Sequence, residues 1–362
     1  MTDAVNSSTD RQFEHAGAET RPIAVVKLSR KHGLRLGDPS ALTIRRVKRG
    51  TGFAFVAADG RTIRNARTIT RLKSLAVPPA YQDVRFADDP DAHLQATGRD
   101  AAGRLQYRYH PDWEKVREAR KAHRLAQFVA VLPRIRRSVA QHLAAKQPTR
   151  EFAHAAVIEL VARTAIRPGH ESYARIRNTR GATTLLKSNI SIERDSVMLS
   201  FRGKGGKTLH KECNAARLVR AIKLLRGIPG SRLFQYVDDG GAVHRVTAAQ
   251  VNEFLRIIAG VGISLKDFRT LMASAAVLES LSRVTPAESA RGRRRQVLEA
   301  VRKAADELAN TPAICRKSYV HDSVVTAFER GLLERFSATL RSCRAQSVRE
   351  QVLGQVLSLG QV

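Results

Sequence analysis

The hydrophobic pattern changes near His110-Pro111, and this change limits the possible folds more than any other feature of the chain. From about Leu42 to Tyr109, short apolar stretches alternate with polar neighbours between turn residues, which is typical of half-buried β-strands. Beyond Asp112, apolar residues recur at helical spacing. Two such sets are Val157, Leu160, Val161 and Thr164, and Val251, Phe254, Leu255 and Ile258. The pattern predicts an α+β chain with a small β-rich N-terminal domain and a larger, mainly α-helical domain.

A β-hairpin insert is predicted within the helical domain. Val197, Leu199 and Phe201 alternate with polar residues, the segment Gly203–Lys207 provides a glycine-rich turn, and Leu209 resumes the alternation. The β-rich domain in turn is expected to contain one helix, near Thr68–Leu75.

Helix-breaking residues divide the helical domain further. We expect interruptions at Pro133 and at Pro168-Gly169, and a helix end at Gly260. The expected limits are a disordered tail over residues 1–35, the β-rich domain over 36–111, the helical domain over 112–340 and a C-terminal tail over 341–362. One more helix is expected within the C-terminal tail.

Charge indicates the class of partner. The chain has 63 Lys and Arg residues against 33 Asp and Glu residues, a formal net charge of +30, and a polyanion is the natural partner for such a protein. The positive charge is spread along the chain, which argues against a basic amphipathic helix at a membrane. No apolar run approaches the roughly 20 residues needed to span a bilayer. The N-terminus lacks the pattern of a secretory signal, so a cytoplasmic, nucleoid-associated protein is expected.

The cysteines and one glycine-rich segment argue against a zinc site, a disulfide framework and a nucleotide-binding P-loop. Cys213, Cys315 and Cys343 are widely spaced and form no C-x-x-C pair, so neither a zinc site nor a disulfide framework is indicated. The segment Gly206-Lys207-Thr208 differs from a phosphate-binding P-loop, since Phe201 stands where that loop needs glycine and a strand is expected next.

Five short segments of the helical domain stand out together, and a tyrosine lies at the end of the last one. They are Ile166–Gly169, Arg202–Lys207, Lys266–Thr270, Asn310–Pro312 and Arg316–Tyr319. A tyrosine can attack a phosphodiester, but its ordinary pKa is about 10, so nearby positive charge must favour the phenolate. Planar arginine side chains suit the phosphate oxygens on which negative charge then builds.

The order and spacing of these segments resemble the catalytic domain of type IB DNA topoisomerases of the poxvirus-like bacterial branch. The β-rich domain also resembles the family, in Val77–Ala80, His93–Asp100 and Gln106–Pro111. The resemblance implies the tyrosine recombinase/topoisomerase IB-like fold.

The resemblance further implies roles for ten residues. Tyr319 would be the nucleophile, Arg167 and Arg269 would clamp the scissile phosphate, and Lys204 would protonate the leaving 5′-oxygen. Asn310 stands where many relatives have histidine and would donate a hydrogen bond to a phosphate oxygen. The residues expected to contact DNA are Gln106, Tyr107, Tyr109, Lys207 and Tyr173.

The activity implied by the resemblance is relaxation of supercoiled DNA. The enzyme would cut one strand of duplex DNA through a 3′-phosphotyrosyl intermediate, let supercoils relax by strand rotation, and reseal the strand. It would use no ATP, metal or other cofactor. We expect a monomer whose two domains close as a clamp around the duplex.

Two other functions fit part of the pattern. A tyrosine recombinase shares the chemistry, but such enzymes usually carry histidine three residues before the second arginine, where this chain has Lys266. A non-enzymatic nucleoid protein would explain the charge without needing Tyr319 or the paired arginines.

Overall fold

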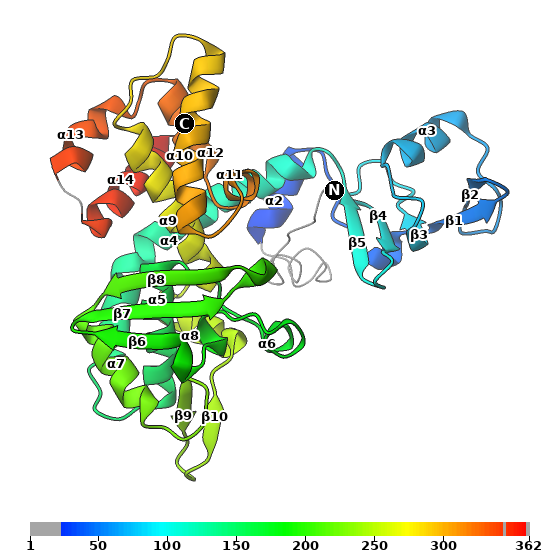
Figure 1. Ribbon diagram of the computed structural model, residues 1–362. Helices are drawn as coiled ribbons and strands as arrows, with labels where there is room; N and C mark the ends of the chain where they lie inside the picture. Colours follow the sequence, from blue (N-terminus) through cyan, green and yellow to red (C-terminus); the bar gives the residue numbers. More distant parts are fainter. Residues whose placement is uncertain (1–22, 343–344, 360–362) are drawn as a thin grey trace. The chain divides into compact units, whose positions relative to one another are not determined.

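The computed structural model of the chain describes residues 23–342 and 345–359 and divides into two compact units, Met1–Lys121 and Ala122–Val362 (Figure 1). The division falls within helix α4, Trp113–His142, rather than at the expected start of the helical domain. The reason is that Trp113 and Val116, in the first turn of α4, are buried against Val25 and Leu34 of the first unit.

The first unit is built on a five-stranded antiparallel sheet with strand order β2-β1-β3-β4-β5. The strands are β1 Ile44–Arg49, β2 Gly52–Val56, β3 Gln82–Phe86, β4 Leu94–Arg99 and β5 Leu105–Tyr109. Helix α3, Ala66–Ser74, lies where one helix was expected, and its Leu72 joins Ile44, Phe55 and Phe86 in a core cluster. The β-rich character predicted for this region is confirmed.

The disordered N-terminal tail was expected over residues 1–35. The structure tests only part of this expectation, because residues 1–22 lie outside the described residues. Residues Ile23–Lys31 form helix α2 instead of a disordered segment. Val25 and, just after the helix, Leu34 are buried beside Trp113. The helix is ordered by this tertiary contact, which its short, strongly basic sequence does not reveal.

The second unit is mainly helical and holds a three-stranded antiparallel sheet, β6-β7-β8, and a two-stranded one, β10-β9. Its helices after α4 are α5 Arg150–Thr164, α6 Glu171–Arg177, α7 Ala216–Arg226, α8 Ala248–Ala259, α9 Leu265–Leu281, α10 Ala290–Glu307, α11 Pro312–Ser318, α12 Asp322–Glu329, α13 Glu334–Ser342 and α14 Gln346–Leu359. Its strands are β6 Ile190–Glu193, β7 Ser196–Arg202, β8 Thr208–Asn214, β9 Gln235–Val237 and β10 Val243–Arg245. Helix α9 is central, since it packs against α5, α8, α10, α12 and α14.

The predicted hairpin is confirmed as β7 and β8, which pair from Ser196 with Asn214 to Arg202 with Thr208. The third strand, β6, and the β9–β10 hairpin were not predicted. Helix α8 ends at Gly260 as expected, with the glycine in a left-handed conformation at φ 67°. Pro168-Gly169 separates α5 from α6, also as expected.

The interruption expected at Pro133 is wrong, because α4 runs through it without a break. A proline within a helix costs about 3 kcal/mol or more, since it removes a hydrogen bond and crowds the preceding turn. Here one apolar face continues past it, and each buried side chain on that face contributes roughly 1.5–3 kcal/mol. That face consists of Leu125, Phe128, Leu132, Ile135 and Val139.

The further helix expected within the C-terminal tail of residues 341–362 is present as α14. Helix α14 packs against α9 and α12 through a buried face. Its Glu350 carboxylate pairs with Arg136 at 2.6 Å, and its Arg349 pairs with Glu279 at 2.8 Å. Residues 343–344 and 360–362, with Cys343 among them, lie outside the described residues. Within the described ranges, no helix is both long and apolar enough to cross a membrane.

Candidate active site

Tyr319 lies at the end of α11 and is buried, with 7% of its surface exposed. Its main chain is tied to α9 through Ser274, whose hydroxyl donates to the Tyr319 carbonyl at 3.0 Å and accepts from the His321 amide at 3.1 Å. The guanidinium carbon of Arg269, also on α9, lies 4.9 Å from the centre of the Tyr319 ring. The structure therefore brings the predicted nucleophile and one predicted phosphate ligand together.

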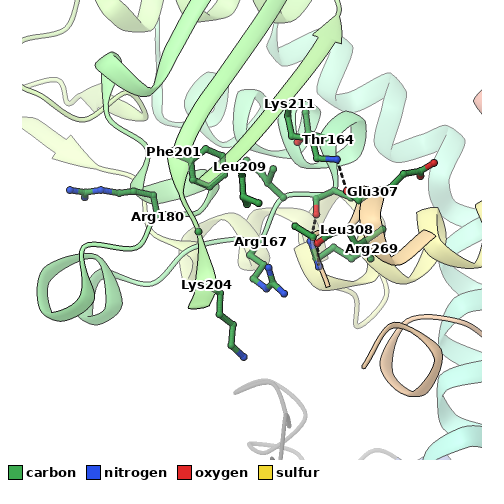
Figure 2. Close-up of a pocket in the computed structure, with 14 residues that line it drawn as sticks. Thr164, Arg167, Arg180, Phe201, Lys204, Leu209, Lys211, Arg269, Glu307 and Leu308 are labelled. Atoms are coloured by element: carbon green, nitrogen blue, oxygen red, sulfur yellow. Dashed lines mark hydrogen bonds between the residues drawn. The ribbon is translucent and has the colours of Figure 1, made fainter. Parts of the chain in front are cut away.

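Arg269 is only 2% exposed and is held by the ends of two helices. Its guanidinium donates to the carbonyl of Ala165, which caps α5 in a left-handed conformation, and to the carbonyl of Leu308 at 3.0 Å, which follows α10 (Figure 2). Carbonyls at helix C-termini carry partial negative charge, so both contacts stabilise a buried cation. The Nε of Arg269 is buried and has no hydrogen-bond acceptor among the described residues.

The pKa of the Tyr319 phenol lies below its ordinary value. Burial, the largest influence, raises this pKa, but the charge and hydrogen bonding of Arg269 and the charges of Arg167 and Lys266 together lower it by more. A phenol with a lowered pKa forms the phenolate more readily, and the phenolate is the form that attacks phosphorus.

Arg167 lies in the segment between α5 and α6 and donates to the side-chain oxygen of Asn310 at 2.9 Å. Burial, and then the charge of Arg269, lower the pKa of Arg167 to about 10, against a raising influence from Tyr319. With its oxygen occupied by Arg167, the Asn310 amide nitrogen is buried and has no acceptor among the described residues. It is therefore a donor available to a phosphate oxygen.

The backbone of Arg167 is held by the segment that begins at Gly181. The Ala182 amide donates to the Arg167 carbonyl and the Thr183 amide donates to the Pro168 carbonyl, each at 2.8 Å. At Gly181 the chains approach so closely that a Cβ would stand 2.5 Å from the Arg167 carbonyl oxygen. Only glycine fits this approach without moving the Arg167 turn.

We expect Gly181→Ala to lower the free energy of unfolding by about 1–3 kcal/mol and to slow DNA cleavage, because the new methyl group displaces the Arg167 carbonyl. Thermal unfolding and single-turnover cleavage measure the two effects. Gly262→Ala is the matched control, since a Cβ there meets nothing within 4 Å and Gly262 has no positive φ. Equal stability and equal cleavage in the two variants would contradict the proposed close packing.

Lys204 is exposed at the tip of the β7–β8 hairpin, in the short turn η5, Lys204–Gly206. It lines one pocket together with Arg167 and Arg269, and Figure 2 shows Lys204 and Arg167 extending toward the same open side of it. The turn contains two glycines at φ 78°, a conformation that other residues rarely adopt. A lysine at this tip is placed to reach a substrate bound in the pocket.

Two basic residues that line the pocket were missed from the sequence, Lys211 and Arg180. Lys211 is half-buried on β8, and its ammonium donates to the carbonyl of Glu307. The alternation of the strand places Lys211 on the inward face with Leu209 and Cys213, which was the signal available. Arg180 directly precedes Gly181 in the segment that holds the Arg167 turn.

The remaining predicted DNA-binding residues are divided between the units. In the second unit, Lys207 is exposed beside the hairpin tip, and Tyr173 on α6 is 53% exposed with the Arg177 guanidinium 5.3 Å from its ring. In the first unit, the Gln106 side chain donates to Asp100 at 2.9 Å. Tyr107 and Tyr109, the other two predicted DNA-binding residues of this unit, are half-buried on β5.

Comparisons with known proteins identify the family of the chain. A family model for the catalytic core of eukaryotic DNA topoisomerase I matches residues 108–345, and one for the N-terminal domain of bacterial DNA topoisomerase IB matches residues 52–100. The chain is also 28% identical over 293 residues to DNA topoisomerase 1B of Acanthamoeba polyphaga mimivirus, a match that covers 79% of this chain and 87% of the viral protein. These matches confirm the predicted resemblance and name topoisomerases rather than recombinases or packaging proteins. The chain belongs to the type IB DNA topoisomerases.

Proposed function

We propose that Tyr319 is the nucleophile of this topoisomerase and that the residues around it bind the scissile phosphate. The Tyr319 phenolate oxygen attacks phosphorus, a phosphotyrosyl bond forms at the 3′ end of the cut strand, and the bond to the 5′-oxygen breaks. Because the energy of the broken bond is kept in the phosphotyrosyl ester, the 5′-hydroxyl can reverse the step without ATP. Between the two steps, rotation of the free strand relaxes supercoils.

The observation that carries this assignment is a pair of buried donors for which the described residues offer no acceptor, one beside the Tyr319 ring and one beside Arg167. They are the Nε of Arg269 and the amide nitrogen of Asn310, and each is left over after the side chain's other contacts are made. Buried donors of this kind are costly unless a ligand satisfies them. A phosphate oxygen carries the charge that both donors favour, and Arg167 and Arg269 together line one pocket.

Lys204 is proposed to donate the proton that the departing 5′-oxygen needs. It is an exposed cation at the pocket mouth, whereas Arg167 is held by Asn310 and Arg269 by two main-chain carbonyls. In this scheme the fixed cations of the site stabilise the charge of the transition state, the task that metal ions perform in other phosphoryl-transfer enzymes.

At the level of the whole molecule, we propose a monomer whose two units close around duplex DNA. One active site cuts one strand, so a single copy is sufficient for the reaction. The first unit would provide Gln106, Tyr107 and Tyr109, and the second unit would provide Lys207 and Tyr173. The formal charge of +30 supports binding dominated by phosphate contacts and an association with the nucleoid.

The test is relaxation of plasmids of either supercoil sign, in excess EDTA and without ATP. We expect complete relaxation of both, with closed circular products. DNA affinity should fall about 10³–10⁵-fold between 50 and 200 mM salt if roughly 6–10 phosphates are contacted. A requirement for a divalent metal, or accumulation of nicked circles that are never resealed, would contradict the proposed mechanism.

A further inference from the structure

Lys211 connects the hairpin sheet to the end of α10. Its ammonium donates to the main-chain carbonyl of Glu307, the last residue of α10 (Figure 2). The carbonyl of the next residue, Leu308, accepts the hydrogen bond from Arg269. Asn310, the partner of Arg167, follows within the same turn. One short segment therefore joins Lys211 to both of the proposed phosphate-binding arginines.

The burial of Lys211 calls for a specific function. The inward face of β8 otherwise carries Leu209 and Cys213, so an apolar side chain would satisfy the packing there. Burial, the largest influence, lowers the pKa of Lys211, the charge of Glu307 raises it, and the charge of Arg269 lowers it. A lysine that is desolvated near another cation is retained only where its contact compensates, and the negative end of a helix provides such a contact.

The turn that Lys211 contacts has a backbone conformation that needs support. Ala309 has φ 48°, in the left-handed region that disfavours a residue with a Cβ, and glycine is the usual residue at this place after a helix. The turn is closed by the main-chain N–H of Asn310, which donates to the Ala305 carbonyl at 2.8 Å. Lys211 adds a contact from outside the turn, through Glu307.

We propose that Lys211 is a positioning residue of the active site, and that its ammonium holds the segment 307–310 so that Leu308 orients Arg269 and Asn310 orients Arg167. This inference rests on the proposed roles of Arg269, Arg167 and Asn310. Lys211 itself touches neither the phosphate nor the leaving oxygen in this scheme; it acts through the turn.

The first experiment compares Lys211→Met and Lys211→Arg in single-turnover cleavage and religation on a duplex substrate. Lys211→Met should slow both steps about 10–100-fold, since a displacement of about 1 Å in a catalytic group costs on the order of 10²-fold. DNA binding should change by less than about 3-fold, a free-energy change well under the 1.4 kcal/mol of a tenfold effect. Lys211→Arg should recover most of the rate, because a guanidinium can also donate to the Glu307 carbonyl.

A matched control and a thermal measurement separate positioning from loss of folding. Lys223→Met removes an exposed lysine on α7 and should leave both rates unchanged. Rates are compared well below the unfolding temperature of each variant. If Lys211→Met does not fold, Lys211→Leu, which also lacks a donor, takes its place with the same expectation. Unchanged cleavage and religation in folded Lys211→Met or Lys211→Leu would overturn the proposal.

Double variants test the route by which Lys211 acts. In an Asn310→Ala background, Lys211→Met should have less effect than alone, because the part of its effect that passes through Asn310 is already lost. In a Lys204→Ala background its effect should persist in full. If the rate loss of the double variant equals the product of the losses of Lys211→Met and Asn310→Ala, the proposal is overturned.

A substrate with sulfur in place of the bridging 5′-oxygen gives a second readout. A thiolate leaves without being protonated, so this substrate should restore cleavage by Lys204→Ala but not by Lys211→Met. Restoration of Lys211→Met would place Lys211 in the proton supply and overturn positioning. Failure of the proposed function is distinguishable, since Asn310→Ala and Tyr319→Phe would then keep their activity, whatever Lys211→Met does.

Discussion

Replacement of Tyr319 by Phe should abolish relaxation, with a loss of cleavage of about 10⁴-fold or more, the scale seen when a covalent nucleophile is removed. Phenylalanine keeps the ring that lies 4.9 Å from the Arg269 guanidinium carbon but has no oxygen with which to attack phosphorus. DNA binding and thermal stability should therefore be nearly unchanged. The measurement is plasmid relaxation beside equilibrium DNA binding for both proteins.

The position of the covalent bond gives a sharper form of this experiment. When the reaction is stopped with detergent, a strand labelled at its 5′ end should remain attached to the parent protein, because the proposed bond is to a 3′-phosphate. No attachment is expected with Tyr319→Phe. Tyr236→Phe, which changes a half-buried tyrosine on β9, serves as the matched control and should behave as the parent. Attachment of a 3′-labelled strand instead would contradict the proposed polarity.

Loss of Arg269 should have the second largest effect. Arg269→Ala removes a charge from the proposed binding site of the scissile phosphate, and comparable arginines in phosphoryl transfer contribute on the order of 10³–10⁵ in rate. It also leaves the carbonyls of Ala165 and Leu308 without their donor, at about 1–3 kcal/mol each. Arg269→Lys should recover only part of both losses, because an ammonium lacks the planar fork that reaches two carbonyls. Cleavage rates and denaturant unfolding measure the two effects.

The pH dependence of cleavage provides an independent readout of Arg269. Arg269 lowers the pKa of Tyr319, so its removal should raise that pKa and leave less phenolate at any given pH. The rising limb of cleavage rate against pH should therefore move to higher pH in Arg269→Gln and move less in Arg269→Lys, which keeps the charge. Arg283→Ala, which removes a partly exposed arginine paired with Glu279, is the control. If the rising limb of the pH–rate profile of Arg269→Gln lies at the same pH as that of the parent, Arg269 does not lower this pKa as assigned.

Local patterns predicted much of this protein correctly. The alternation of Val197, Leu199 and Phe201 predicts a strand because successive side chains point to opposite faces, and the strand forms as β7. Gly260 ends α8 because glycine adopts the left-handed conformation at low cost. The order of the chemical residues carried the family resemblance, which the comparisons confirm.

Other features depend on packing between distant segments, which no local pattern contains. Pro133 is tolerated within α4 because the apolar face of the helix is buried on both sides of it. Helices α2 and α14 are ordered because Val25 and Val352 join cores formed by other elements. Sequence alone assigned residues 1–35 to a disordered tail, and it indicated a helix near the C-terminus but not its packing, since short helices gain most of their stability from such contacts.

The amino-acid sequence by itself determined the reaction class of this protein, through which residue types it provides and in what order. Only the tertiary structure decided how the proposed site is assembled. Arg269 is held by carbonyls at the ends of α5 and α10, Arg167 by Asn310, and the α10 end by Lys211. These partners are far apart along the chain. Every residue has a main-chain carbonyl, so the residue type does not indicate which carbonyl will accept a hydrogen bond. Their meeting depends on how the helices pack around α9.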